Sequence, residues 1–398
     1  MRSYSPPAHG RELCGEPLQL TIFETEQSSC IDAVADVRDP GIATTDLATT
    51  TISAGAAVAV GVSGGKDSSA VAIRTLEYLD EVGHRGPRLL IHSDLGRVEW
   101  RQSLPMCEKL AERLAVELVI VRRQQGDLLD RFRERWKNNV RRYADLSCVK
   151  LILPWPTAAM RYCTSELKTS VICRELVRRF PGNRIISVSG IRREESSIRA
   201  KAPIAAIQPK LSSVGRRTSG LDWHPIIHWR RSEVLGFLRR RGFELHEAYT
   251  RYGSSRVSCA LCFLSSQSDL AAATMCASNA GIYQDLVRLE VESTFAFQST
   301  HWLADVAPHL LPAELQVAVA DAKQRARMRV TAEAKIPPGL LYVSGWPTRM
   351  PNAGEAVLLA EIRQAVAGAV GMEVGFTTPD AILSRYEELL AARRRKER

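Results

Sequence analysis

The sequence predicts an α/β protein with an open, mainly parallel twisted sheet, helices on both faces and a mostly helical C-terminal region. Three observations support this prediction. Strand-like and helix-like segments alternate from residue 56 onward, a glycine-rich turn joins the first strand to the first helix, and apolar residues recur at helical spacing beyond residue 265. Strands that alternate with helices are joined by right-handed crossovers, which place them in parallel. We therefore expect a Rossmann-like arrangement.

The elements follow one another in three parts of the chain. Residues 1–50 show no sustained period and end in a stretch rich in threonine and alanine, so we expect an irregular arm. Residues 51–265 carry the alternating pattern, which begins with the buried-strand candidate AAVAVGV, and residues 266–398 are mostly helical in character. In order, strands are expected at 56–62, 87–94, 116–123 and 183–190, and helices at 68–82, 100–115, 127–146, 169–180, 230–243 and 310–335.

The composition is that of a globular protein without a membrane span. Of the 398 residues, 45% are hydrophobic and 25% are charged. No apolar run approaches about 18 residues and the start has no secretory pattern, so we expect a cytoplasmic protein. Nine scattered cysteines favour reduced thiols or metal ligands over disulfides. The net charge of +10 favours nucleic acid or nucleotides as partners, although a solvated arginine-rich surface explains the charge equally well.

The stretch VSGGKDSS, residues 62–69, lies where a ligand is expected. In an open parallel sheet, ligands sit beyond the carboxyl ends of the strands, where loop amides and the next helix N-terminus face a negative group. Its glycines allow close backbone approach, its serines offer hydroxyls and its lysine offers a mobile positive charge. We therefore expect this loop to bind phosphate through Ser63, Gly64, Gly65, Lys66 and Ser68.

The loop is not that of the common nucleoside triphosphatases. Val60 occupies the position of their first glycine, and Asp67 replaces their magnesium-binding hydroxyl. The residues SGGKDS instead resemble the PP-loop of the ATP pyrophosphatases, which include the phosphoadenosine phosphosulfate (PAPS) reductase family. The resemblance implies an adenine nucleotide alpha hydrolase-like fold, with ATP and Mg²⁺ as cofactors. It also implies cleavage of ATP between the α and β phosphates, with Lys66 and Asp67 as catalytic residues.

Further stretches extend the resemblance over roughly residues 55–265. IHSDLGRVEW resembles the second strand of the family and implies that Asp94 faces the nucleotide or its metal. VSGIRREESSIRAK resembles the turn after a later strand and implies nucleotide contacts for Gly190, Arg192 and Arg193. HPIIHWRRSEV resembles a segment that leads into a helix. Taken singly, the arginine-rich turn is also typical of a solvated loop. Trp229, taken singly, is also typical of a core residue.

Several cysteines are candidate metal ligands. Cys259 and Cys262 have the C-x-x-C spacing that can hold one metal, and a pair supplies only two ligands. Cys163 lies at a position that resembles the cysteine site of cluster-bearing relatives, and Cys276 follows the pair. We expect a [4Fe-4S] cluster bound by these four thiols. The alternatives are zinc with His246 or His228, a redox dithiol, or ordinary buried cysteines, as expected for Cys107 and Cys173 inside helical patterns.

The resemblance leaves more than one reaction open. A PAPS or adenylyl-sulfate reductase would need a cysteine near the C-terminus, and no cysteine follows Cys276. The intact loop favours ATP-dependent adenylylation of a nucleic-acid backbone or base for replacement of oxygen by sulfur, as in the similar DNA phosphorothioation enzymes. DNA or RNA would be the substrate, and a protein such as a cysteine desulfurase would donate sulfur. A non-catalytic nucleotide sensor that binds nucleic acid, in a mobile element or defence system, is the other alternative.

The segment RFRERWKNNVRRY predicts a basic helix with interleaved aromatic residues. Such a helix is typical of a phosphate-binding element, and also of a solvated helix whose aromatic residues pack inward. The residues concerned are Arg131, Arg133, Arg135, Lys137, Arg141, Arg142, Trp136 and Tyr143.

Overall fold

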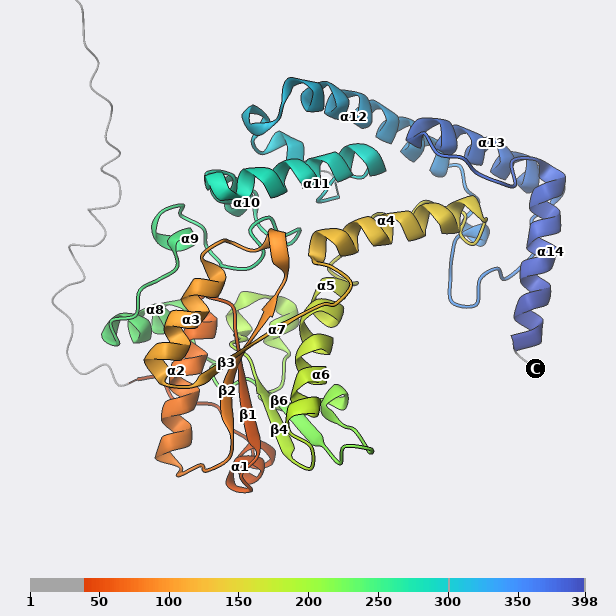
Figure 1. The fold of residues 1–398 in the computed structure, drawn as a ribbon. Coiled ribbons are helices and arrows are strands. Elements are labelled where there is room, and N and C mark those ends of the chain that lie inside the picture. Colours follow the sequence, from red (N-terminus) through yellow and green to blue (C-terminus); the bar gives the residue numbers. More distant parts are fainter. Residues whose placement is uncertain (1–38, 300, 397–398) are drawn as a thin grey trace, which may run out of the picture. The chain divides into compact units, whose positions relative to one another are not determined.

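The computed structural model describes residues 39–299 and 301–396, which contain a six-stranded, mostly parallel sheet flanked by helices (Figure 1). The strand order is β3-β2-β1-β4-β6-β5, and only β5 is antiparallel to its neighbour. The predicted fold class is confirmed. The strands are β1 (Ala57–Val62), β2 (Arg88–Asp94), β3 (Glu117–Arg122), β4 (Arg184–Val188), β5 (Ala205–Ile207) and β6 (Ser219–Trp223).

The chain reverses its direction of travel across the sheet at β1. It passes from β1 to β2 and β3 on one side, and then crosses back to β4 on the other side of β1. The loops that follow β1 and β4 therefore open next to each other at the carboxyl edge of the sheet. A ligand site is expected at such a switch point.

Helices cover both faces of the sheet. Side chains of four helices pack with Val58, Val60 and Val62 on one face, and α6 (Ser170–Arg179) packs with Ala59 on the other. Strand β1 is almost entirely buried, as expected for a parallel strand covered on both sides. The four helices of the first face are α1 (Asp46–Ser53), α2 (Lys66–Glu81), α3 (Ser103–Leu114) and α8 (Arg231–Arg240).

Helix α1 and strands β5 and β6 differ from the sequence prediction. Residues 46–53, expected to be irregular, form α1 because the Thr45 hydroxyl caps the helix at the Ala48 amide and Ile52 packs into the core. Residues 1–38 of the expected arm lie outside the described residues. Strands β5 and β6 were not predicted, since they are three and five residues long and have no clear alternation.

The region after residue 265 is helical and shares a hydrophobic core with α4 (Leu128–Ala144). The predicted helical character is confirmed. Trp136 and Tyr143 of α4 are buried in this core together with Tyr283 and Tyr386 from the C-terminal helices. These helices are α10 (Gln267–Thr274), α11 (Ala280–Ser293), α12 (Ala313–Glu333), α13 (Ala353–Val370) and α14 (Pro379–Lys396).

A buried arginine attaches α13 to the end of α4. The Arg363 guanidinium donates to the carbonyls of Tyr143 and Ala144 at 2.9 and 3.0 Å, and its carbon lies 4.8 Å from the Tyr143 ring centroid. The last carbonyls of a helix lack partners within it and carry negative partial charge, so a cation there is favourable. No helix in the described ranges is long and apolar enough to cross a membrane.

Candidate functional site

The loop between β1 and α2 has the conformation of an anion cradle. The Ser68 hydroxyl donates to the Gly65 carbonyl at 2.8 Å and accepts from the Ser63 amide at 3.2 Å, which closes the turn. Gly64 has φ of +73°, and a Cβ there would lie 2.8 Å from the Ser103 carbonyl oxygen. Only glycine fits this position without displacing α3.

The amides of this loop are available to a ligand. Over residues 39–299 and 301–396, no hydrogen-bond acceptor faces the amides of Gly64, Gly65, Asp67 and Ser68. Gly65 is the N-cap of α2 and supplies no side-chain cap. The helix N-terminus adds positive partial charge at the same place. Unpartnered donors that converge in this way are suited to bind an anion with several oxygen atoms.

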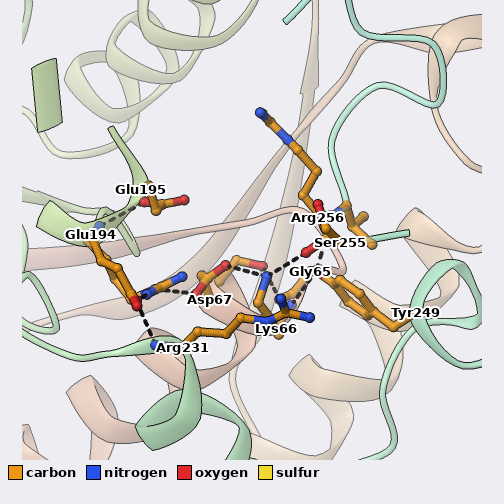
Figure 2. Close-up of polar contacts among 12 residues, drawn as sticks. Gly65, Lys66, Asp67, Glu194, Glu195, Arg231, Tyr249, Ser255 and Arg256 are labelled. Carbon is orange, nitrogen blue, oxygen red and sulfur yellow. Dashed lines mark hydrogen bonds and ion pairs between the residues drawn. The ribbon is translucent and has the colours of Figure 1, made fainter. Parts of the chain in front are cut away.

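Lys66 points from the first turn of α2 into the same space (Figure 2). Its side chain is only 5% exposed. The ammonium donates to the Ser255 carbonyl at 3.2 Å, pairs with the Asp67 carboxylate at 3.2 Å and lies 5.0 Å from the centroid of the Tyr249 ring. A buried lysine held beside an anion cradle supplies the positive charge that a phosphate group requires.

Tyr249 of α9 (Glu247–Thr250) covers the loop. Its hydroxyl accepts from the Lys66 amide at 3.2 Å and from the Val257 amide at 3.1 Å. A Cβ on Gly65 would lie 3.3 Å from this hydroxyl, so the packing is tight. Burial raises the pKa of Tyr249 well above its usual range, and the phenol therefore stays protonated.

Asp67 joins the loop to the segment after β4. Its carboxylate accepts from Arg192 Nε at 2.6 Å, and the Arg192 guanidinium also contacts Glu194 at 2.5 Å. Burial opposes the charge on Arg192, but Asp67 and Glu194 outweigh it and raise the pKa of this arginine. Glu194 in turn accepts from the Arg231 amide at 2.7 Å, which connects α8 to the same network (Figure 2).

Gly190 allows the segment after β4 to approach α2. A Cβ at this position would lie 2.5 Å from the carbonyl oxygen of Asp67, closer than real Cβ contacts occur. Arg193, predicted as a second phosphate contact, turns away from the loop: it donates to the Ala202 carbonyl at 3.3 Å and contacts His228 at 3.5 Å. The structure thus brings Gly190 and Arg192 to the loop but not Arg193.

Asp94 lies at the carboxyl end of β2, as the sequence predicts, and its carboxylate is already engaged. One oxygen accepts from the Gly96 amide at 2.7 Å, and the other pairs with Arg122 of β3 at 2.6 Å. The structure therefore places Asp94 at the correct edge of the sheet, with its partners on the β3 side of the loop.

Three of the four predicted cysteine ligands are neighbours. Burial raises the pKa of Cys163, and the nearby Cys262 raises it further. Burial also raises the pKa of Cys259 to about 12, and Cys262 and Cys163 add to the effect, whereas Lys168 opposes it at both thiols. The surrounding protein therefore keeps the Cys163 and Cys259 thiols protonated, and Lys168 is the nearby cation that favours their thiolates.

A π-helical turn positions Cys163 and Lys168. Cys163 lies in α5 (Tyr162–Thr164), and the turn η2 (Ser165–Thr169) follows directly and continues into α6. The Ser93 hydroxyl at the end of β2 donates to the Leu167 carbonyl, which fixes this turn at the carboxyl edge of the sheet. Such turns are frequent at functional sites. The chain is thus helical from Tyr162 onward, earlier than the helix expected at 169–180.

Cys276 does not join the other three thiols. It is buried at the end of α10, where its sulfur contacts the Ser278 hydroxyl at 3.2 Å. No group of three or more His, Cys, Asp or Glu side chains in the described residues is arranged to hold a metal ion. The predicted four-cysteine set is therefore not assembled in the structure: Cys276 contacts Ser278, and Cys163, Cys259 and Cys262 are near one another without forming such a group.

The other predicted cysteines and histidines have structural surroundings. Cys107 and Cys173 are buried in α3 and α6, which confirms their assignment to the core. His246 caps α9 through the Ala248 amide at 3.0 Å, and burial lowers its pKa to about 4. His228 contacts Arg193. Trp229 is buried, and its indole donates to the Gly41 carbonyl.

The basic helix α4 uses most of its arginines within the protein. Arg131 pairs with Glu166 at 2.7 Å, Arg133 pairs with Asp285 at 3.4 Å, and Arg135 lies 4.8 Å from the Tyr162 ring centroid. The interleaved aromatic side chains Trp136 and Tyr143 are buried. Of the two interpretations of the sequence, this arrangement matches the helix whose aromatic residues pack inward, rather than the phosphate-binding helix.

Sequence reasoning missed Tyr249, Ser255, Arg231 and Lys168. The Lys66–Tyr249 contact joins residues 183 positions apart, and no local pattern marks such a pair. The Ser255 carbonyl is a backbone group, so residue type gives no signal. Arg231 has a guanidinium close enough to lower the pKa of Tyr249. The sequence did offer a signal for Arg231, because this residue lies in the segment HPIIHWRRSEV at the start of a predicted helix.

Comparison with known proteins gives one family match. The model of the phosphoadenosine phosphosulfate reductase domain matches residues 57–264. No curated protein matches the sequence.

Among solved structures, the chain is similar to FMN adenylyltransferase of Candida glabrata in complex with FAD and inorganic pyrophosphate. The identity is 14% over 51% of this chain and 54% of that chain, with a TM-score of 0.32, so the match spans about half of that protein. PAPS reductase from Candida auris in a phosphate complex has 14% identity over 51% and 80%, with a TM-score of 0.32. U34-tRNA thiolase NcsA from Methanococcus maripaludis with its [4Fe-4S] cluster has 14% identity over 64% and 81%, with a TM-score of 0.26.

Proposed function

Because the chain belongs to the phosphoadenosine phosphosulfate reductase domain family, we propose that it cleaves ATP between the α and β phosphates and adenylylates an oxygen atom of its substrate for replacement by sulfur. The observation that carries this proposal is the set of four unpartnered loop amides, within the described residues, next to the buried Lys66 ammonium. That set faces the switch point between β1 and β4, where nucleotides bind in open sheets.

The first step is an in-line displacement at the α phosphorus. The loop amides and Lys66 bind the β and γ phosphates and stabilise the charge of the leaving group. The substrate oxygen bonds to the α phosphorus, and any proton that the acceptor group carries is lost to solvent. The bond from the α phosphorus to the oxygen bridging to the β phosphate breaks, and pyrophosphate leaves with the electron pair. The protein contributes position and charge stabilisation.

Asp67 and Arg192 hold the loop in place for this step. Their 2.6 Å contact ties the first turn of α2 to the segment after β4. Mg²⁺ bound to ATP needs few protein ligands because it keeps several waters and phosphate oxygens. Asp67 and Asp94 are the acidic residues proposed to meet it: Asp67 through the carboxylate oxygen that does not face Arg192, and Asp94 after it gives up part of its pairing with Arg122.

The second step replaces AMP by sulfur, and here the proposal involves Cys163, Cys259 and Cys262. A persulfide sulfur on Cys259 or Cys262 attacks the activated atom and expels AMP. The other thiol of the pair then attacks the new disulfide, which releases the thiolated product and leaves a Cys–Cys disulfide for an external thiol to reduce. A protein such as a cysteine desulfurase would supply the persulfide. The cysteine geometry of the described residues does not complete a four-thiol iron–sulfur or zinc site, so the proposed sulfur transfer uses the cysteine thiols themselves.

A basic hollow on α6 supports nucleic acid as the acceptor. The hollow, of about 600 Å³, is lined by Ser170, Cys173, Arg174, Val177, Arg178, Lys210 and Arg216. Arg178 pairs with Glu175, whereas Lys210 contacts neutral oxygens. Among the residues that the structure describes, Arg174 and Arg216 face no carboxylate. Guanidinium groups without acidic partners are suited to phosphate.

The test is incubation of the protein with ATP labelled at the α phosphate and a panel of DNA, tRNA and small acceptors. We expect release of AMP and pyrophosphate that depends on one acceptor. The change Lys66→Ala should lower turnover by about 100-fold or more, because one preorganised charge stabiliser is lost. Lys109→Ala, which removes an exposed lysine 3.9 Å from Glu244, is the matched control. ATP binding without pyrophosphate release would instead support a nucleotide sensor.

A further inference from the structure

The segment from Tyr249 to Val257 occupies hydrogen-bond donors that the proposed function assigns to a phosphate. Its hydroxyl and carbonyl oxygens accept from the Lys66 amide and the Lys66 ammonium (Figure 2). Resting on the proposed function for the loop, we propose that Tyr249 is a positioning residue that links occupancy of the loop to the position of the Cys259–Cys262 pair. ATP binding displaces the Tyr249 hydroxyl and thereby releases the segment that leads to these thiols.

The Tyr249 hydroxyl and a phosphate oxygen exclude each other at the Lys66 amide. One N–H donates one strong hydrogen bond, and the hydroxyl holds it at 3.2 Å. The contact leaves no gap between hydroxyl and loop, because a Cβ on Gly65 would already lie 3.3 Å from the hydroxyl oxygen. A phosphate that reaches this amide must therefore move the Tyr249 side chain.

The Lys66 ammonium is occupied in the same way. An ammonium has three protons. One is used by the Ser255 carbonyl at 3.2 Å, a second faces Asp67 at 3.2 Å, and the third side faces the Tyr249 ring at 5.0 Å from its centroid. A phosphate bound to this ammonium takes the place of at least one of these partners. Asp67 also contacts Arg192 at 2.6 Å, so the Ser255 carbonyl and the Tyr249 ring are the partners free to leave.

The displaced residues are directly connected to the thiols. The Tyr249 hydroxyl also accepts from the Val257 amide at 3.1 Å, two residues before Cys259. Cys259 forms an isolated backbone bridge with Glu99, which holds the start of the C-x-x-C turn against the segment after β2. When Tyr249 leaves, Val257 loses its acceptor, and the chain between Ser255 and Cys259 is then held by this bridge and its packing.

An aspartate holds the other end of the segment. Asp269 of α10 accepts through its carboxylate from the Ser255 amide at 2.6 Å and from the Ser255 hydroxyl at 2.9 Å. Ser254 donates to the same carboxylate at 3.2 Å. Asp269 therefore presents the Ser255 carbonyl to Lys66, and a change at Asp269 should weaken the cover without touching the loop.

The experiment compares Tyr249→Phe with wild type in the full chain. The probe is α,β-methylene ATP, which cannot be cleaved between the α and β phosphates. We expect Tyr249→Phe to lower the Kd of this analogue by about fivefold, because the hydroxyl no longer competes for the Lys66 amide. Tyr78→Phe is the matched control, since Tyr78 lies on α2, packs on Trp223, and has a hydroxyl that makes no hydrogen bond within the described residues.

The second measurement is the alkylation rate of Cys163, Cys259 and Cys262 by iodoacetamide, followed by mass spectrometry. In wild type, we expect the analogue to change the rate at Cys259. In Tyr249→Phe, the rate without the analogue should already equal the rate that wild type shows with it. A merely structural role for the hydroxyl predicts no such response of the thiols to nucleotide.

The outcomes separate this proposal from the proposed function. If the analogue does not bind wild type at all, the proposed function fails. If it binds, and Tyr249→Phe binds it equally or more weakly with unchanged thiol rates, only the role of Tyr249 is overturned. Asp269→Asn, with folding checked by circular dichroism, provides an independent variant. It should also tighten binding of the analogue, and weaker binding would contradict the proposal.

Discussion

At the scale of single residues, the candidate site depends on positions where backbone segments nearly touch. Gly190 brings the segment after β4 against the Asp67 carbonyl, and Gly64 brings the loop against the Ser103 carbonyl. In both cases the opposing atom is backbone, which cannot turn aside as the end of a flexible side chain can. These two glycines therefore set how closely β4 and α3 approach the loop.

Gly190→Ala should damage both stability and nucleotide binding. The new methyl group would lie 2.5 Å from the Asp67 carbonyl oxygen and would force the first turn of α2 away from β4. We expect the free energy of unfolding, measured with urea, to fall by about 2 kcal/mol. The affinity for an ATP analogue should fall as well.

Gly281→Ala is the control for this substitution. A Cβ at Gly281 in α11 has no heavy atom within 4 Å. There, alanine should leave stability unchanged or raise it by up to about 1 kcal/mol, since it favours the helix. If the two variants change the free energy of unfolding equally, the close contact at Gly190 does not contribute to stability.

His92 is a buried charged residue directly behind the loop. Its imidazole contacts the Val62 carbonyl at 3.0 Å and the Glu99 carboxylate at 3.1 Å. Burial lowers the pKa of His92, but contacts with Cys107 and Glu99 outweigh burial and raise it to about 10. The folded protein therefore binds this proton more tightly than the unfolded chain does.

The stabilisation from His92 should depend on pH. It is fully present below the unfolded pKa of 6.5 and is lost as pH rises toward about 10, because the unfolded chain releases the proton first. His92→Gln should therefore cost more unfolding free energy at pH 6.5 than at pH 10, as measured by urea titrations. The exposed His309→Gln is the control. A His92→Gln penalty that stays constant over this range would contradict the charged state.

At the scale of elements, two basic segments have different uses. Helix α4 pairs Arg131 and Arg133 with Glu166 and Asp285 and buries its aromatic residues, so it joins parts of the protein. The α6 hollow presents Arg174 and Arg216 without carboxylate partners in the described ranges. Surface charges that are already paired gain little from a phosphate, whereas unpaired ones release counterions when they bind it. The hollow is therefore the better candidate for nucleic-acid contact.

Removing charge from the hollow should change the salt dependence of DNA or RNA binding. The double variant Arg174→Ala with Arg216→Ala should lower the slope of log K against log salt by about two, because two phosphate contacts are lost. Fluorescence anisotropy over a range of salt concentrations measures this slope. Removal of two exposed charges from α4, Lys137→Ala with Arg141→Ala, is the matched control. A larger change in the control than in the hollow variant would reverse the assignment.

At the scale of the whole molecule, the fold was predictable where pattern and contact are local. The alternating strands and helices of residues 56–123 and the loop Ser63–Ser68 follow from short periodic runs, and the structure has both. Strand β5 and helix α1 were not predictable, because three residues have no period and α1 depends on its Thr45 cap and its packing on the sheet.

The candidate site was predictable only in its central part. The loop and Arg192 come from recognisable stretches, but the cover by Tyr249 and Ser255 depends on tertiary contacts 183 and 189 positions away in sequence. The cysteine prediction combined the C-x-x-C spacing of Cys259 and Cys262, a resemblance at Cys163 and the nearby Cys276. In the structure Cys163, Cys259 and Cys262 are neighbours, whereas Cys276 packs beside Ser278. A pattern gives the chemistry available, and only packing decides which groups meet.

The long separation between Lys66 and Ser255 has a consequence for synthesis on the ribosome. Translation adds about 5 to 20 residues per second, so roughly 10 to 40 seconds pass between the emergence of the lysine and of the serine that covers it. During that interval Lys66 and the glycine-rich turn before it are uncovered in the nascent chain. Cellular anions therefore contact this turn before Tyr249 has been synthesised.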